Sequence, residues 1–166
     1  MKSHPLAIAG LNPADPREAR EILEGYDKTG PFRTGFQQVQ EFHDRFAIPC
    51  YRVPANLPED VAQFRIKFLQ EELDEYKKSV AEGDLAGALD ALIDLVYVAL
   101  GTADMHGFSN FDAAFYLVHR ANMLKERAKK ASDSKRGSTY DVVKPHGWKP
   151  PAVHVAISLL TGEDVD

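Results

Sequence analysis

Two glutamates stand on the apolar face of a predicted helix in the segment FLQEELDEYKKSV, residues 68–80. At about 100° per residue, Glu72 falls near the middle of an apolar stripe, and Glu75 lies about 60° to one side. The stripe consists of Val61, Phe68, Leu69 and Tyr76. A buried carboxylate must be protonated or paired with a cation, because burying a bare charge costs too much free energy.

The next predicted helix repeats this pattern in the segment ALDALIDLVYVALG. Asp90 and Asp94 are four residues apart and share one face, which Tyr97 continues. Two long helices joined by a short turn are expected to pack antiparallel. Glu72 and Glu75 would then face Asp90 and Asp94 across the helix pair.

Four carboxylates at helical spacing offer the hard oxygen ligands that suit Mg²⁺ or Mn²⁺. Such an ion could hold phosphate oxygens and polarise an attacking water, while an unligated carboxylate takes the proton. Glu71 lies at the rim of the stripe, and the sequence leaves open which of Glu71, Glu72 and Glu75 is the base. A single E-x-x-E is common on solvated helices, but two acidic pairs on neighbouring apolar faces favour a metal site. Asp104 is expected to be a helix-end residue.

Polar groups also continue the apolar stripe of a fourth predicted helix, in VHRANMLKERAKK. Asn122 and Lys125 are placed to reach phosphate oxygens, although KERAKK alone is typical of a solvated helix end. Lys135 and Arg136 stand beside Gly137 and predict either a basic flap that orders on a polyphosphate or a disordered basic loop. Trp148 is expected to anchor the C-terminal arm.

The predicted fold is all-α, a bundle of four principal helices. The helices are expected at about 36–46, 58–81, 85–106 and 110–131, the third of them buried on most sides and the fourth capped by Ser109 and Asp112. A short helix is expected at 16–26, and 152–160 is ambiguous between strand and helix. The expected organisation is an N-terminal arm (1–35), a catalytic helical domain (36–131) and a basic loop with a C-terminal arm (132–166).

The composition limits the possible partners and compartments. A net charge of −5 and a pI near 5.7 argue against a nucleic acid polymer or an anionic membrane as the main partner. Cys50 is the only cysteine, which excludes an internal disulfide and a Cys-based zinc site. We read neither a signal peptide nor an apolar stretch of bilayer length, so a cytoplasmic location is expected.

Several segments together resemble the all-α nucleoside triphosphate pyrophosphohydrolases, the superfamily of MazG, the dimeric dUTPases and phosphoribosyl-ATP pyrophosphohydrolase. They are VQEFHDRFAIP, EELDEY, DALIDLVYVALGTADMHG, VHRANMLK and SKRGSTYDVVKPHGWKPP. The order of these segments is similar to the MazG-like branch that phages often encode. The resemblance implies Mg²⁺-dependent cleavage of a nucleotide between its α- and β-phosphates, in the cytoplasm of a host cell if the chain is phage-encoded. It also implies a homodimer or a tetramer of paired dimers.

Residue roles follow from the same resemblance. It implies Glu72, Glu75 and Asp94 as metal ligands. The second acidic pair of the family is usually E-x-x-D, and because Ala91 occupies its first position here, Asp90 is the expected replacement. The expected substrate-binding residues are Phe36, Val39 and His43 near the base, together with Tyr97, Asn122, Lys125, Lys135 and Arg136.

The choice of base stays open between purines and pyrimidines such as dUTP or dCTP. Overall similarity to the MazZ-like phage enzymes, which act on guanine nucleotides, favours a purine such as dGTP. An HD-type metal phosphohydrolase is the alternative enzyme, although His43-Asp44 lacks an obvious set of further ligands. GPFRTGF lacks the Lys-Ser/Thr of a P-loop. A non-catalytic helical module that binds a nucleotide is the alternative from another class.

Overall fold

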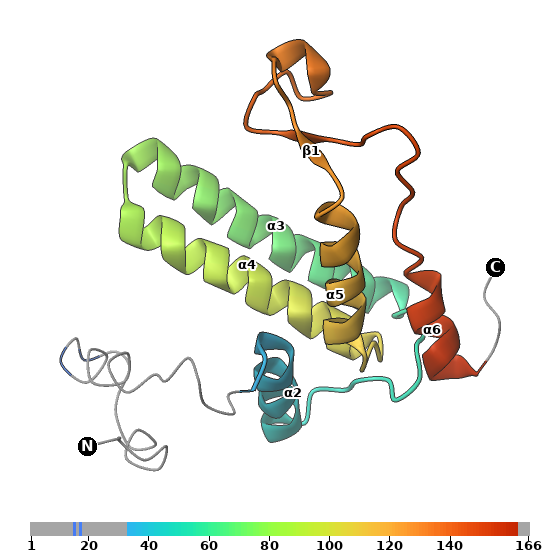
Figure 1. Cartoon of the computed structure of the whole chain (residues 1–166). Helices are drawn as coiled ribbons and strands as arrows, with labels where there is room; N and C mark the ends of the chain where they lie inside the picture. The colour runs from blue at the N-terminus through green and yellow to red at the C-terminus, as the bar shows by residue number, and fades with distance from the viewer. Residues whose placement is uncertain (1–14, 16, 18–32, 163–166) are drawn as a thin grey trace, which may run out of the picture. The chain divides into compact units, whose positions relative to one another are not determined.

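The computed structural model describes residues 33–162, together with Asp15 and Arg17. The expected helix at 16–26 therefore lies outside the described residues. By its internal contacts the chain divides into units Met1–Arg33 and Thr34–Asp166, and everything below concerns the second unit. In its described part, helices dominate and one short pair of strands is present (Figure 1). These elements are α2 (Gly35–Phe46), α3 (Glu59–Glu82), α4 (Leu85–Met105), α5 (Phe111–Asn122), β1 (Glu126–Arg127), β2 (Val142–Val143) and α6 (His154–Thr161).

Helix α2 begins at a complete capping box. The Thr34 hydroxyl accepts from the backbone N–H of Gln37 at 3.2 Å, and the Gln37 side chain accepts from the Thr34 N–H at 3.0 Å. The helix ends at Ala47, which adopts a left-handed conformation with φ of 51°. The helix predicted at 36–46 is confirmed.

Helices α3 and α4 form an antiparallel pair, visible side by side in Figure 1. The turn between them needs Gly83 at φ of 71°, a conformation that glycine adopts without penalty. Asp84 then caps α4 by accepting from the N–H of Gly87 at 3.0 Å. Both predicted spans are confirmed within one or two residues, and so is the all-α fold class.

The buried core is small, and most of its residues lie on α2 and α4. The apolar side chains buried in the described residues are Phe36, Val39, Ala91, Val98, Ala103, Met105 and Ala128. Helix α4 was expected to be buried on most sides, and within one chain this is wrong. Leu85 is 85% exposed, Leu89 62% and Ile93 54%, because no element of the described part covers that face of α4.

The apolar character of α4 corrects a second expectation. An 18-residue window of this 21-residue helix has a mean hydropathy of 1.6, so α4 is long and apolar enough to cross a membrane by length and composition. The expectation that no apolar stretch reaches bilayer length is therefore wrong. Asp90 and Asp94 near the middle of α4 would be costly in a bilayer core, and a core helix of a protein passes the same test.

Helix α5 ends at Asn122, so the prediction that it continues to Ala131 is wrong. The indole N–H of Trp148 donates to the last-turn carbonyl of Ala121 at 2.9 Å. The polar run KERAKK offers no apolar face for a helix to bury, and the chain instead forms β1, which pairs antiparallel with β2. The backbone N–H of Ala128 continues this pairing by donating to Asp141 O.

The remaining elements correct or resolve two expectations. Asp112 does not pair with Ser109 to cap α5, because its carboxylate accepts from the Thr34 hydroxyl at 2.7 Å instead. The ambiguous segment at 152–160 forms the helix α6, and the Asn110 side chain fixes it by donating to Ala156 O at 2.8 Å. A short 3₁₀ turn at Ala131–Asp133 lies between the two strands in sequence.

Candidate functional site

A cavity of about 560 Å³ lies among α2, α3 and α4. Four aromatic side chains line it: Phe42, Phe64, Phe68 and Tyr97. Charged and polar residues that share this lining are His43, Arg65, Glu72 and Asp94. A mostly apolar cavity with a few converging polar groups is the usual form of a small-molecule site.

Glu72 is the buried carboxylate of this cavity, with 9% of its surface exposed. Burial raises its pKa most, and the negative charges of Asp94, Glu75, Glu71 and Asp90 raise it further. Helices α3 and α4 therefore bring the predicted acidic residues close enough to act on one another. Glu71, Glu75, Asp90 and Asp94 themselves are exposed.

In the part of the chain that the structure describes, no cation compensates these carboxylates. Among the described residues, no Lys, Arg or His nitrogen lies within 4.0 Å of Glu72, Glu75, Asp90 or Asp94. Repelling carboxylates without a cationic neighbour are the donor set that a divalent cation would stabilise. The oxygens of these four carboxylates do not form a cluster of three or more within 4.8 Å of one another. In the described part of the chain, only His43, Cys50 and Asp104 bring three ligand atoms that close together.

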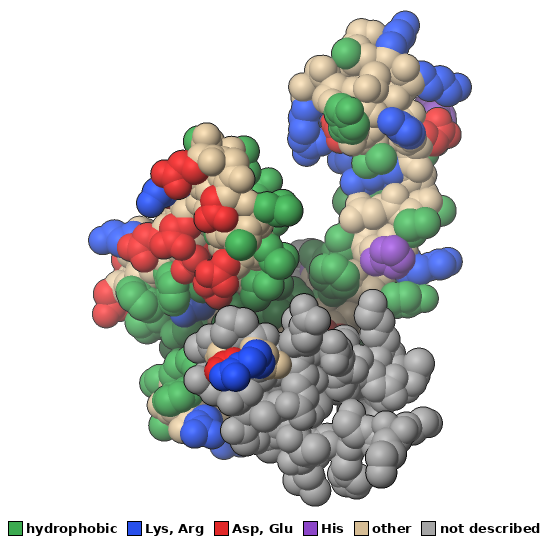
Figure 2. Space-filling model, turned by 90° about the vertical axis from the view of Figure 1, so that its left-hand side faces the viewer, with side chains coloured by type: hydrophobic (Ala, Val, Ile, Leu, Met, Phe, Trp, Pro, Cys, Tyr) green, Lys and Arg blue, Asp and Glu red, His purple; other side chains and the backbone are tan. Residues whose placement is uncertain are grey.

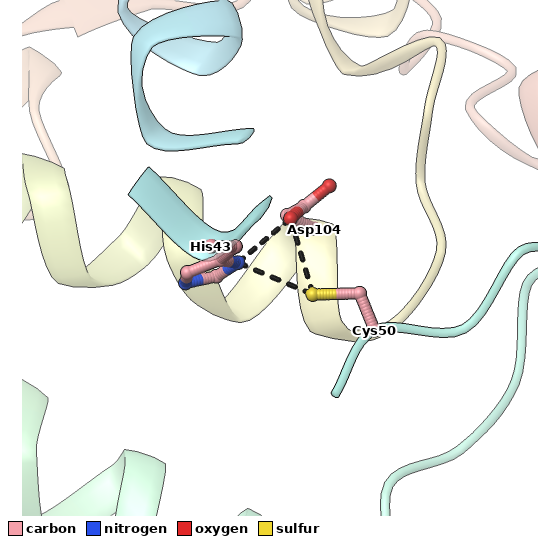
Figure 3. A group of neighbouring side chains, drawn as sticks. All are labelled: His43, Cys50 and Asp104. Atoms are coloured by element: carbon pink, nitrogen blue, oxygen red, sulfur yellow. Dashed lines mark hydrogen bonds and ion pairs between the residues drawn. The ribbon is translucent and has the colours of Figure 1, made fainter. Parts of the chain in front are cut away.

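His43, Cys50 and Asp104 form a hydrogen-bonded triangle beside the cavity (Figure 3). His43 Nδ1 lies 2.7 Å from Asp104 Oδ2, and Cys50 Sγ lies 3.2 Å from each of these atoms. Gln40 donates to the other oxygen of Asp104 at 3.1 Å. The triangle thus fixes the His43 ring, which also lines the cavity.

The environment of the triangle keeps the Cys50 thiol protonated. Burial, followed by the hydrogen bond to Asp104, raises the pKa of Cys50 to about 12. Nitrogen, sulfur and carboxylate oxygen could also hold a transition metal, but here they are joined directly to one another. Sequence reasoning treated Asp104 as a helix-end residue. Asp104 does stand in the last turn of α4, but it is buried in this triangle.

The residues expected near the base separate into two groups. Phe36 and Val39 are 2% and 1% exposed, and Phe36 stacks on Phe111 with ring centroids 5.2 Å apart. They are core residues and are not part of the cavity lining. His43 and Tyr97 do line the cavity, and burial, followed by the charge of Glu41, raises the pKa of Tyr97.

The residues expected at the phosphates lie on α5 and beyond it. Asn122 is exposed at the end of α5. Lys125, Lys135 and Arg136 line a second cavity of about 430 Å³ together with Lys144. Figure 2 shows acidic side chains gathered on one part of the visible face and basic side chains gathered on another. The structure therefore brings three of the predicted basic residues together, but not into the cavity that holds Glu72.

The basic cavity is internally ordered. The Arg136 guanidinium donates to both oxygens of Asp141 at 2.9 and 3.0 Å, and the Ser134 hydroxyl donates to Asp141 at 2.6 Å. The ammonium of Lys125 lies 5.3 Å from the centroid of the Trp148 ring. These contacts give the loop one defined conformation in the absence of ligand, which neither of the two alternatives from the sequence specified.

Arg65 is a cavity residue that the sequence analysis missed. It is 8% exposed and stands seven residues before Glu72, hence on the same face of α3. This spacing was the available signal, since an arginine lay within the apolar stripe that contains Glu72.

The comparisons with known proteins identify one family. The profile of the family described as phosphoribosyl-ATP pyrophosphohydrolase matches residues 39–122. The match spans α2 from Val39, all of α3 and α4, and α5, so it includes both acidic pairs and Arg65. The comparison with curated proteins finds no significant match.

Proposed function

Since the chain belongs to the phosphoribosyl-ATP pyrophosphohydrolase family, within the MazG-like superfamily of nucleotide pyrophosphohydrolases, we propose that it hydrolyses a nucleoside triphosphate between the α- and β-phosphates. The products are a nucleoside monophosphate and pyrophosphate. The single observation that supports this activity most is Glu72, a buried carboxylate at an aromatic cavity, surrounded by four further acidic residues.

The donor set fits a divalent cation, Mg²⁺ with Mn²⁺ as a substitute. The oxygens of Glu72, Glu75, Asp90 and Asp94 are hard ligands, and burial, followed by the repulsion of the neighbouring carboxylates, raises the pKa of Glu72 when no cation is present. When bound, the ion supplies charge neutralisation at the phosphates and polarises the attacking water.

The residues of the chain have separable tasks in this reaction. The four aromatic rings of the cavity hold the base and exclude water from it. One of Glu71, Glu72 and Glu75 accepts the proton of the attacking water as the new phosphorus–oxygen bond forms. The bond between the α-phosphorus and the bridging oxygen breaks, and pyrophosphate leaves with that oxygen.

The basic cavity supports a second task. Lys125, Lys135 and Arg136 gather positive charge that suits a polyphosphate, and Asn122 adds an amide near the end of α5. We assign these residues to the phosphates or the sugar of the substrate. The assignment requires this cavity and the carboxylates to approach the same nucleotide, within one chain or across two.

The surface of α4 supports the proposal of an assembly of identical chains. Leu85, Leu89, Ile93 and Val96 are exposed at helical spacing and form one apolar stripe, whose exposure to water is unfavourable. We propose a homodimer, or a tetramer of paired dimers, that buries this stripe. We place the protein in the cytoplasm, that of a host cell if a phage encodes it.

The base of the substrate is proposed as a purine, as in dGTP, in line with the MazZ-like phage branch. Pyrimidine triphosphates such as dUTP and dCTP are the alternative. The aromatic lining of the cavity is compatible with stacking on either kind of base.

One assay tests the proposed reaction. The protein is incubated with Mg²⁺ and a panel of NTPs, dNTPs and phosphoribosyl-ATP, and pyrophosphate is separated from orthophosphate. Monophosphate with pyrophosphate supports the proposal. Release of orthophosphate would indicate a different phosphohydrolase, and binding without turnover would indicate a nucleotide-binding module.

A further inference from the structure

Arg65 carries a buried charge that, in the described part of the chain, contacts neutral groups alone. Its Nη2 donates to the carbonyl of Val98 at 2.7 Å and its Nε donates to the Thr102 hydroxyl at 3.0 Å. Among the described residues, no carboxylate lies within 4.0 Å of the guanidinium. A buried guanidinium held only by neutral oxygens retains the capacity to bind a further acceptor.

The remaining nitrogen of Arg65 is available to a ligand. Nη1 makes no hydrogen bond to the described part of the chain. In that part, every side-chain nitrogen or oxygen that is sealed from solvent has a hydrogen-bond partner. Nη1 must therefore be accessible to solvent. Arg65 also lines the aromatic cavity.

The wall of the cavity is shaped around this group. A Cβ on Gly101 would lie 3.1 Å from Arg65 Nη2 and 3.1 Å from His43 Nε2. Glycine thus leaves room for both side chains to approach α4 closely. The Arg65 guanidinium also lies 5.4 Å from the centroid of the Phe68 ring, and these contacts hold it in one orientation.

The distance from the carboxylates indicates which part of a nucleotide meets Arg65. Seven residues of α-helix separate Arg65 from Glu72, roughly 10 Å along the axis. This distance is longer than the spacing between adjacent phosphates of a nucleotide. If the phosphates lie near Glu72 and Asp94, Arg65 is therefore placed at the far edge of the base. The aromatic rings around Arg65 are likewise suited to a base.

We infer that Arg65 determines base specificity by donating hydrogen bonds to the O6 and N7 acceptors of a 6-oxopurine in the aromatic cavity. Arginine pairs with these two adjacent acceptors of guanine, whereas adenine presents an amino donor at position 6. This inference rests on the proposed function, because it takes the substrate to be a nucleotide with its phosphates at the acidic residues.

The test compares kcat/KM for dGTP, dITP, 7-deaza-dGTP and dATP in wild type and Arg65→Gln, with Mg²⁺. The wild type should prefer dGTP and dITP over dATP and lose roughly 10-fold on 7-deaza-dGTP, which lacks N7. Arg65→Gln should lose roughly 10–100-fold on dGTP and dITP and little on dATP, because glutamine pairs with adenine. Arg52→Gln, at an exposed arginine, is the matched control and should leave all four values unchanged.

Several outcomes would overturn the inference. An equal loss on all four nucleotides would place Arg65 at the phosphates, and a wild type without preference for the 6-oxopurines would remove the role altogether. If Arg65→Gln fails to fold, the analogue series on wild-type protein can still overturn the inference, because it requires a preference for the 6-oxopurines and a loss on 7-deaza-dGTP. If the wild type turns over none of the substrate panel, the proposed function fails, and calorimetric binding of dGMP against dAMP tests the base preference separately.

Discussion

His43 on α2 and Asp104 on α4 are joined by a buried hydrogen bond of 2.7 Å between Nδ1 and Oδ2. The bond links residues that are 61 positions apart in sequence, and Cys50 adds a contact to each of them. It ties α2 to the end of α4 and fixes the His43 ring at the wall of the aromatic cavity. Both stability and site geometry should depend on it.

Asp104→Ala should lower the free energy of unfolding by about 1.5–3 kcal/mol, the usual range for a hydrogen bond to a charged group. The variant removes the carboxylate that pairs with buried His43 Nδ1 and with the Cys50 thiol. Urea unfolding followed by circular dichroism measures the change. Asp74→Ala is the control, since Asp74 pairs only with exposed partners on its own helix, and it should show no measurable change. Equal stabilities of the two variants would contradict the structural role of the triangle.

Glu72→Gln should abolish turnover without lowering the melting temperature of the metal-free protein. Burial and neighbouring carboxylates raise the pKa of Glu72, so its ionised form opposes folding above its unfolded pKa. Removing the charge relieves that cost, and the metal-free variant should melt at the same temperature or higher. Activity and differential scanning calorimetry are the measurements.

Added Mg²⁺ provides the matching control for the Glu72 variant. Mg²⁺ should raise the melting temperature of the wild type, because it binds the native state. The increase should be much smaller in Glu72→Gln. Asp94→Asn should likewise lose turnover while remaining folded. Near-full activity in either variant would show that these carboxylates are not the metal site.

The Cys50 thiol should react slowly with iodoacetamide at pH 8. Its pKa of about 12 leaves far less thiolate than an unperturbed cysteine has at that pH. The alkylation rate should keep rising beyond pH 9 without a plateau, as long as the protein stays folded. Mass spectrometry of the time course gives the rate. In Asp104→Ala, which removes a carboxylate that raises the pKa of the thiol, alkylation should be faster at every pH, and a wild-type plateau near pH 9 would refute the prediction.

The ordered loop between β1 and β2 should loosen in acid. Hydrogen bonds from Ser134 and the Val142 N–H, followed by Arg136, lower the pKa of Asp141. A depressed pKa means that this carboxylate stabilises the loop above its unfolded pKa and that the effect is lost as pH falls through the folded value. Hydrogen exchange across 128–143 should therefore lose protection in acid, and Asp141→Asn should show the low-pH behaviour already at neutral pH. Protection that is equal in both proteins would contradict this role.

The helices that position the site were predictable because their signals are local. The turn around Gly83 and Asp84 and the helical spacing of Asp90 and Asp94 sufficed to place the acidic residues on facing helices. The end of α5 was not predictable, because the Trp148 bond to Ala121 joins residues 27 positions apart. The triangle was not predictable either, because Asp104 is far in sequence from His43 and Cys50. Arg65 was overlooked although its spacing from Glu72 was visible.

The exposed stripe of α4 leads to the last prediction. Leu89 is 62% exposed in the single chain, and the stripe to which it belongs should be buried between copies. Leu89→Glu places a charge in that interface and should dissociate the assembly to monomers, because an unpaired buried charge is costly. Light scattering coupled to size-exclusion chromatography measures the mass. Leu159→Glu, at a 77% exposed leucine of α6 outside the stripe, should keep the wild-type assembly. A wild type that is monomeric at all accessible concentrations would refute the proposed interface.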